Sequence, residues 1–159
     1  MSEYLVFSVI GDDRPGIVEE LSKVVLDAGC NVEDSRMTVL GSSFAVIQLA
    51  SGHWDKVSKL EIALAGLQRE RGLAVMSKRT GARHAQGQYL PYMVEVIGLD
   101  HPGIVNELAG FFSNRGINIE DMATSSQPAA HTGTPIFAVQ IGIGVPAQLH
   151  IASLREDFM

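Results

Sequence analysis

Two short runs of polar and turn-forming residues carry groups that can bind a small zwitterion. The first run is Asp13-Arg14-Pro15-Gly16-Ile17, and the second is Gly29-Cys30-Asn31-Val32. A helix that begins near Pro15 would expose the backbone N–H groups of Gly16 and Ile17, which suit a carboxylate. Asp13 can accept a hydrogen bond from an ammonium group, and the Asn31 amide both donates and accepts. The pattern is typical of a site for a free amino acid.

Both runs return 87 residues later, as Asp100-His101-Pro102-Gly103-Ile104 and Gly116-Ile117-Asn118-Ile119. Fourteen of the 26 aligned positions between Val9 and Asp34 are identical to those of the second copy. This self-similarity predicts a tandem of one small module. The second copy offers a matching set of candidate ligand-binding residues: Asp100, His101, Gly103, Ile104 and Asn118. Arg14 and His101 occupy a variable position beside the site. His101 can make binding sensitive to pH, but the favoured interpretation is a surface histidine without a role.

Each candidate also has a purely structural interpretation. Asp13 can fix the turn or cap the helix. Gly16 can permit close packing of the backbone, and Asn31 can tolerate an unusual backbone angle after Gly29. The binding interpretation gains weight because the whole set occurs twice.

The elements that must position these residues follow from hydrophobic periodicity. A helix is expected from Pro15 to Gly29, and a second helix carries an apolar stripe that starts at Trp54 and ends before Gly72. Strands are expected over residues 5–10, 32–40, 44–50 and 73–76. The order β-α-β-β-α-β is that of an α+β, ferredoxin-like fold. We therefore expect two βαββαβ modules in tandem.

The second module departs from the first at two places. A longer loop is expected near 125–134, because the offset between matching strands grows from 87 to 93 residues there. No fourth strand follows the last apolar stretch, so the second module is expected to be incomplete at its C-terminus. The predicted organisation is a first domain over 1–77, a linker over 78–90 and a second domain over 91–159.

Composition argues against several classes of function. The net charge of −6 disfavours direct binding to nucleic acid. Cys30 is the only cysteine and replaces Ile117 of the second copy, so it is expected to be a small buried apolar residue. The histidines show no paired ligand spacing, and no metal or cofactor is expected. Nothing in the sequence is typical of a signal peptide or a membrane span, which favours the cytoplasm.

The two repeated motifs resemble those of ACT domains, the small regulatory modules of amino-acid metabolism. The resemblance rests on Asp-x-Pro-Gly followed by an aliphatic residue, and on Gly-x-Asn followed by another. A pair of modules without an attached enzyme is similar to the glycine cleavage system transcriptional repressor family. The resemblance implies amino-acid binding at interfaces between modules, with glycine or serine favoured. It also implies homo-oligomers with sheets joined side by side, and a transcription factor or a metabolic enzyme as protein partner.

Three other functions compete with a non-catalytic amino-acid sensor. The first is a dimerisation or adaptor module that binds no ligand. The second is a regulatory subunit of an amino-acid biosynthetic enzyme. The third is an acylphosphatase-like enzyme, in which Arg14 and Asn31 would act on an acyl phosphate; the loss of the arginine in the second copy argues against it.

Overall fold

The computed structural model describes residues 2–81, 89–99, 103–128, 135–146, 155, 157 and 158. The chain divides into two compact units, Met1–His84 and Ala85–Met159. Each unit has a hydrophobic core of its own.

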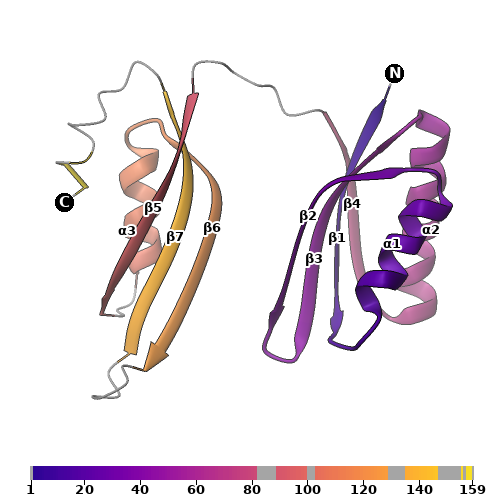
Figure 1. The fold of residues 1–159 in the computed structure, drawn as a ribbon, viewed down its shortest axis with the longest axis horizontal. Helices are drawn as coiled ribbons and strands as arrows, with labels where there is room; N and C mark the ends of the chain where they lie inside the picture. The colour runs from indigo at the N-terminus through magenta and orange to yellow at the C-terminus, as the bar shows by residue number, and fades with distance from the viewer. Residues whose placement is uncertain are drawn as a thin grey trace. The chain divides into compact units, whose positions relative to one another are not determined.

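The first unit is a four-stranded antiparallel sheet with two helices on one face (Figure 1). Its elements are β1 (Glu3–Asp12), α1 (Ile17–Asp27), β2 (Asn31–Leu40), β3 (Ser43–Gly52), α2 (Trp54–Arg71) and β4 (Ala74–Thr80). The strand order is β2-β3-β1-β4, with every pair antiparallel. The expected βαββαβ module is therefore confirmed.

Alternation along the strands explains why the helices cover only one face. Leu5, Phe7 and Val9 of β1 are buried, while the residues between them lie on the opposite face. On β3, Phe44 and Val46 are buried in the same core. The face of this sheet opposite α1 and α2 is called the open face below.

Glycines mark both ends of α1. Gly16 is the N-cap with φ 87°, and Gly29 follows the C-cap with φ 80°. The Cys30 N–H donates to the Val25 carbonyl over 3.2 Å, which closes the last turn and directs the chain into β2. Cys30 is buried, as expected, and burial raises the pKa of its thiol.

One expected core residue is exposed. Trp54 is the first residue of α2 and is 68% exposed. The core-facing stripe of α2 begins one turn later, at Val57, and continues through Leu60 and Leu64. The helical spacing of Trp54 was thus a misleading signal, because a residue in the first turn can extend beyond the edge of the surface that the helix covers.

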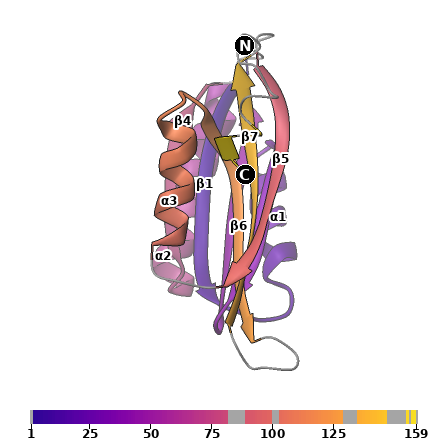
Figure 2. The same ribbon diagram turned by 90° about the vertical axis from the view of Figure 1, so that its left-hand side faces the viewer.

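The second unit has a three-stranded antiparallel sheet in the order β5-β7-β6 (Figure 2). Among its described elements, α3 is the helix. Its elements are β5 (Tyr89–Leu99), α3 (Ile104–Ser113), β6 (Asn118–Pro128) and β7 (Pro135–Pro146). No fourth strand follows β7 among the residues that the structure describes. Phe158 packs on Phe111 and Phe112 of α3, with ring centroids 5.1 and 5.7 Å away.

The extra residues of the second unit lengthen its hairpin. β6 continues through Pro128, so the expected loop over 125–134 is wrong in its first four residues. Residues 129–134 lie outside the described part of the chain. β4 and β5 also extend into the stretch 78–90, ending at Thr80 and starting at Tyr89.

A β-bulge occurs at the same place in both units, directly after the Gly-x-Asn motif. The register shifts between Val32 and Asp34 in β2, and between Ile119 and Asp121 in β6. In the first unit the extra residue is Glu33, whose carboxylate accepts a hydrogen bond from the Ser51 hydroxyl. The repeated Glu-Asp pair therefore marks a bulge, which re-aims the following side chains.

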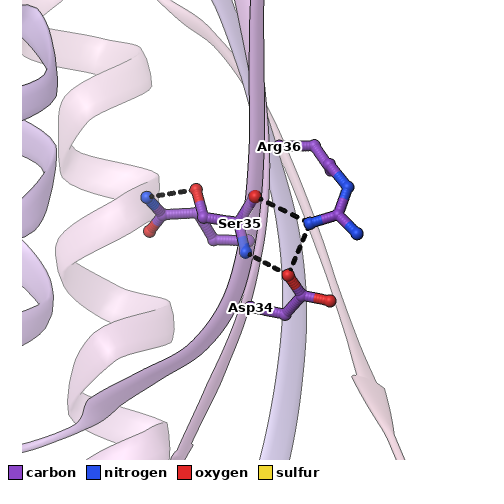
Figure 3. Close-up of polar contacts among 4 residues, drawn as sticks. Asp34, Ser35 and Arg36 are labelled. Atoms are coloured by element: carbon purple, nitrogen blue, oxygen red, sulfur yellow. Dashed lines mark hydrogen bonds and ion pairs between the residues drawn. The ribbon is translucent and has the colours of Figure 1, made fainter. Parts of the chain in front are cut away.

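After the bulge, β2 alternates between the two faces of the sheet. Figure 3 shows Asp34 and Arg36 on one side of the strand and Ser35 on the other. Ser35 accepts a hydrogen bond from the amide of Gln48, which is 5% exposed and lies on the helix-covered face of β3. The Gln48 Oε1 atom is buried and has no partner in the described residues. At the matching positions the second unit pairs Met122 with Ile141.

Replacing Gln48 with Ile, the residue of the second unit, is expected to raise the free energy of unfolding of the first unit by about 1 kcal/mol, because it removes a buried acceptor without a donor. Urea unfolding measures the effect. The control is Gln48→Ala, which removes the same acceptor but leaves a cavity and is expected to destabilise. Loss of stability in both variants would contradict the prediction.

Candidate functional site

The first half of the candidate site is the start of the leading helix of each module, which is α1 in the first module and α3 in the second. The N-cap glycines Gly16 and Gly103 have φ values of 87° and 85°, a conformation that favours glycine. No atom of the described residues, apart from their own chain neighbours, lies within 4 Å of the position that a Cβ would take at either glycine. Among the residues that the structure describes, no side chain forms a capping hydrogen bond at the start of either helix. The first backbone N–H groups of α1 are therefore open to an anionic ligand.

The turn before α1 is held by the backbone of Asp13 and not by its side chain. The Asp13 N–H donates to the Ser42 carbonyl of the β2–β3 turn over 3.2 Å. The Asp13 carboxylate has no hydrogen-bond or ion-pair partner among the described residues and is exposed. It is thus available to a ligand and caps nothing in this structure.

Arg14 is engaged within the module. Its Nη2 atom donates to Glu20 Oε2 over 2.7 Å, and Arg71 Nη2 lies 3.3 Å from Glu20 Oε1. The hydrogen bond from Arg14 is the main reason that the pKa of Glu20 is lowered, with the charge of Arg71 adding to it and burial opposing it. Arg14 therefore ties the turn to α1, an interaction between residues six positions apart that no helical spacing rule signals.

The second half of the candidate site lies at the other end of each leading helix. In the second unit, a hollow of about 440 Å³ opens to solvent at the end of α3 and the start of β6. Its lining is Ala109, Ser113, Gly116, Ile117, Asn118 and Ile119. Asn118 was expected here, whereas Ser113 and Ala109 were not. A signal for them does exist, since two small residues four apart on the last turns of a helix leave room above the Gly-x-Asn motif.

The structure separates the two halves within one module. Gly16 and Ile17 begin α1, whereas Asn31 follows its end, and 11 helical residues span about 16 Å. The side chain of Ile17 is buried in the core, so only its backbone can serve a ligand. A free amino acid cannot reach across α1 to contact both groups. In the second unit Gly103 and Ile104 stand at one end of α3 and Asn118 at the other, while Asp100 and His101 lie outside the described residues.

The described residues show neither a metal-type cluster nor a membrane-spanning helix. No three of the described His, Cys, Asp and Glu side chains come together as metal ligands would. None of the described helices has the length and apolar character needed to cross a bilayer.

Comparison with known proteins places these features in a family. The ACT domain family matches this chain twice, over residues 3–78 and 92–149. The chain is a tandem ACT-domain protein. It is 33% identical over 155 residues to the glycine cleavage system transcriptional repressor of Escherichia coli strain K12, a match that spans 98% of this chain and 82% of that protein. The Shigella flexneri repressor shows the same identity and coverage.

Two crystal structures resemble this tandem ACT protein over nearly its whole length. One is of a protein provisionally assigned as a glycine cleavage system transcriptional repressor, with a TM-score of 0.75, 30% identity, and coverage of 99% of this chain and 89% of that one. The other is of an unknown protein from Galdieria sulphuraria, with a TM-score of 0.74, 29% identity, and coverage of 99% and 94%.

Membership of this family makes the tandem ACT protein a regulatory protein and not an enzyme. The geometry also argues against the acylphosphatase-like alternative. Arg14 is bound to Glu20, and Asn31 lies at the opposite end of α1 from it, so the two residues cannot act together on one acyl phosphate within a module.

Proposed function

We propose that this tandem ACT protein senses a small amino acid, glycine or serine, and passes the signal to a protein partner in the control of glycine cleavage. The observation that carries the proposal is the division of the site between the two ends of one helix. The N-terminal end, at Gly16, offers N–H donors and a positive dipole to a carboxylate. The C-terminal end, at Asn31, offers acceptors and a negative dipole to an ammonium group.

A second copy of the chain would complete the site if its leading helix ran antiparallel to that of the first. Each ligand would then bind to the start of one helix and the end of the other. The flank of the first module is suited to such pairing, because β2 is an edge strand whose ten residues are all exposed. Leu26 of α1 and Met37 of β2 are apolar and lie uncovered along this flank.

The lining of the hollow in the second module indicates the class of ligand. Ser113 and Asn118 supply a hydroxyl and an amide, and none of the described lining side chains is ionised. Such a lining suits a ligand whose only charges are its carboxylate and ammonium groups. Glycine and serine meet this condition, and the related repressors are named for glycine cleavage.

Thermal unfolding with each of the twenty amino acids at millimolar concentration tests the proposal. A ligand at about 100 times its dissociation constant stabilises by roughly 2.7 kcal/mol, a shift of roughly 5 to 10 °C in the midpoint for a chain of this size. We expect the shift with glycine or serine, and its loss in Asn31→Ala or Asn118→Ala. Asn114→Ala is the matched control, because Asn114 is exposed beside the same helix end without lining the hollow.

Two outcomes would change the proposed function. No shift with any of the twenty amino acids would favour an adaptor that binds no ligand. A shift together with co-purification of a biosynthetic enzyme would favour a regulatory subunit. The net charge of −6 supports action through a protein partner rather than on DNA.

A further inference from the structure

The open face of the first module carries large apolar side chains that no element of the module covers. Ile10 of β1, Ile47 of β3 and Met76 of β4 are 50%, 49% and 74% exposed. Strand pairing places them together, since Ser8 lies opposite both Ile47 and Met76, and Ile10 is two residues further along β1. Surface apolar groups gathered in this way mark interaction sites.

Charge on the open face is arranged as a dipole across the sheet. Asp34 of β2 pairs in register with Leu49 of β3, which pairs with Val6 of β1, which pairs with Lys78 of β4. These four residues, called the 34–78 row, place an acid at one edge, a base at the other and two apolar residues between. The Asp34 carboxylate contacts its neighbour Arg36 through Oδ1 over 2.7 Å, and Figure 3 shows its second oxygen pointing away from that contact.

We propose that the open face of the first module is a self-complementary interface that binds the same face of a second copy of this chain. A two-fold axis parallel to the strands places β2 of one copy over β4 of the other. The 34–78 rows then lie antiparallel, so that Asp34 of each copy faces Lys78 of its partner. A second row runs from Arg36 through Ile47 and Ser8 to Met76. The same axis places Arg36 of each copy opposite Met76 of its partner, and Ile47 opposite Ser8.

The competing two-fold arrangement lacks this complementarity. An axis perpendicular to the strands places β4 over β4, and Lys78 then faces only outward residues of β4, which are Ala74, Met76, Lys78 and Thr80 and include no acid. Aligned sheets pack with their strands within about 30° of each other, which long side chains such as Lys78 accommodate. The charges therefore select one orientation.

The size of the face sets the expected strength. Four strands about 4.8 Å apart, each with four outward residues, present about 500 Å² per copy and about 1,000 Å² in total. This lies at the low end for specific interfaces, so the dimer is expected to be weak and to depend on protein concentration. The interface lies on the side of the sheet opposite α1 and uses neither the Gly16 nor the Asn31 end of the proposed ligand site.

Charge reversal in the full-length chain tests the proposal. The parent chain and all of its variants carry Leu26→Glu, so that pairing through the α1 flank does not contribute. Sedimentation velocity over about 1 to 200 µM is expected to show a monomer–dimer equilibrium. Asp34→Lys alone and Lys78→Asp alone are each expected to raise the dissociation constant about tenfold or more, because each places two like-charged pairs in the interface.

The decisive result is recovery. An equal mixture of the two single variants is expected to form heterodimers, because the row of one then carries two bases and the row of the other two acids. The double variant Asp34→Lys/Lys78→Asp is expected to dimerise as the parent does. Lys59→Asp, an equal charge change on an exposed residue of α2, is expected to leave the dissociation constant unchanged.

Ile47→Lys, which places a charge in the centre of the face, is expected to abolish the dimer while circular dichroism shows a folded chain. The proposal is overturned if the parent stays monomeric over the whole range, if Ile47→Lys leaves the dimer intact, or if mixing the two single variants restores nothing. Each of these results is independent of any amino-acid ligand, so the proposed function can stand or fail separately.

Discussion

Replacement of Phe44 with Ala is expected to lower the free energy of unfolding of the first module by about 3 to 5 kcal/mol. Phe44 is fully buried on β3, and its ring edge lies 3.2 Å from the position that a Cβ on Gly11 would take. A module of about 80 residues has only about 4 to 12 kcal/mol of stability in total. The variant therefore loses a large part of what holds the module folded.

Urea unfolding followed by tryptophan fluorescence measures this effect in the first module alone, because Trp54 is the only tryptophan in the chain. Two controls bracket the result. Ile62→Ala changes an exposed residue of α2 and is expected to stay within about 0.5 kcal/mol of the parent. Phe137→Ala empties the matching position of the second module and is expected to leave the Trp54 transition in place. A Phe44→Ala variant that unfolds at the parental urea concentration would contradict this description of the core.

Gly11→Ala is expected to destabilise the first module by about 1 to 3 kcal/mol through overpacking. A Cβ at this position would lie 2.5 Å from Leu73 Cδ2 and 3.2 Å from Phe44 Cε1, both in side chains that the core holds in place. The backbone of Gly11 is that of an ordinary strand, so the cost arises from lack of space and not from the backbone angles.

The second copy supplies the matched control for this substitution. Gly98 occupies the equivalent position on β5, and no atom of the described residues lies within 4 Å of its Cβ site. Gly98→Ala is therefore expected to be neutral or slightly stabilising, since alanine restricts the unfolded chain more than glycine does. Thermal unfolding of the two variants side by side tests the contrast. Equal effects at the two positions would show that space beside Gly11 is not the cause.

The sequence predicts the fold well because its strongest signals are local and occur twice. The glycines after α1 and α2 end their helices where expected, and the alternation in β1 and β3 defines the buried face. Trp54 fails because helical spacing identifies a stripe without showing where the covered surface ends. The sequence does not indicate the bulge at Glu33, because one extra residue in a strand leaves the turn and glycine signals around it unchanged.

The candidate site is less predictable because its residues are close in sequence and distant in space. Only 14 positions separate Ile17 from Asn31, yet a whole helix lies between them. The engagement of Arg14 by Glu20 and the opening beside Ser113 both depend on how side chains pack, which spacing alone does not encode. The sequence identifies the residue types that suit a zwitterion, and the structure shows that they lie at opposite ends of the leading helix.

The central position of β1 affects the order in which the chain can fold as it is synthesised. β1 leaves the ribosome before both of its sheet neighbours, since β3 ends at Gly52 and β4 at Thr80. At about 5 to 20 residues per second, the 68 residues from Asp12 to Thr80 take roughly 3 to 14 s to appear. During that time the apolar stretch from Leu5 to Ile10 has at least one unpaired edge, the condition under which strands associate wrongly. In the nascent first module, β1 is therefore open to wrong pairing until β4 completes the sheet.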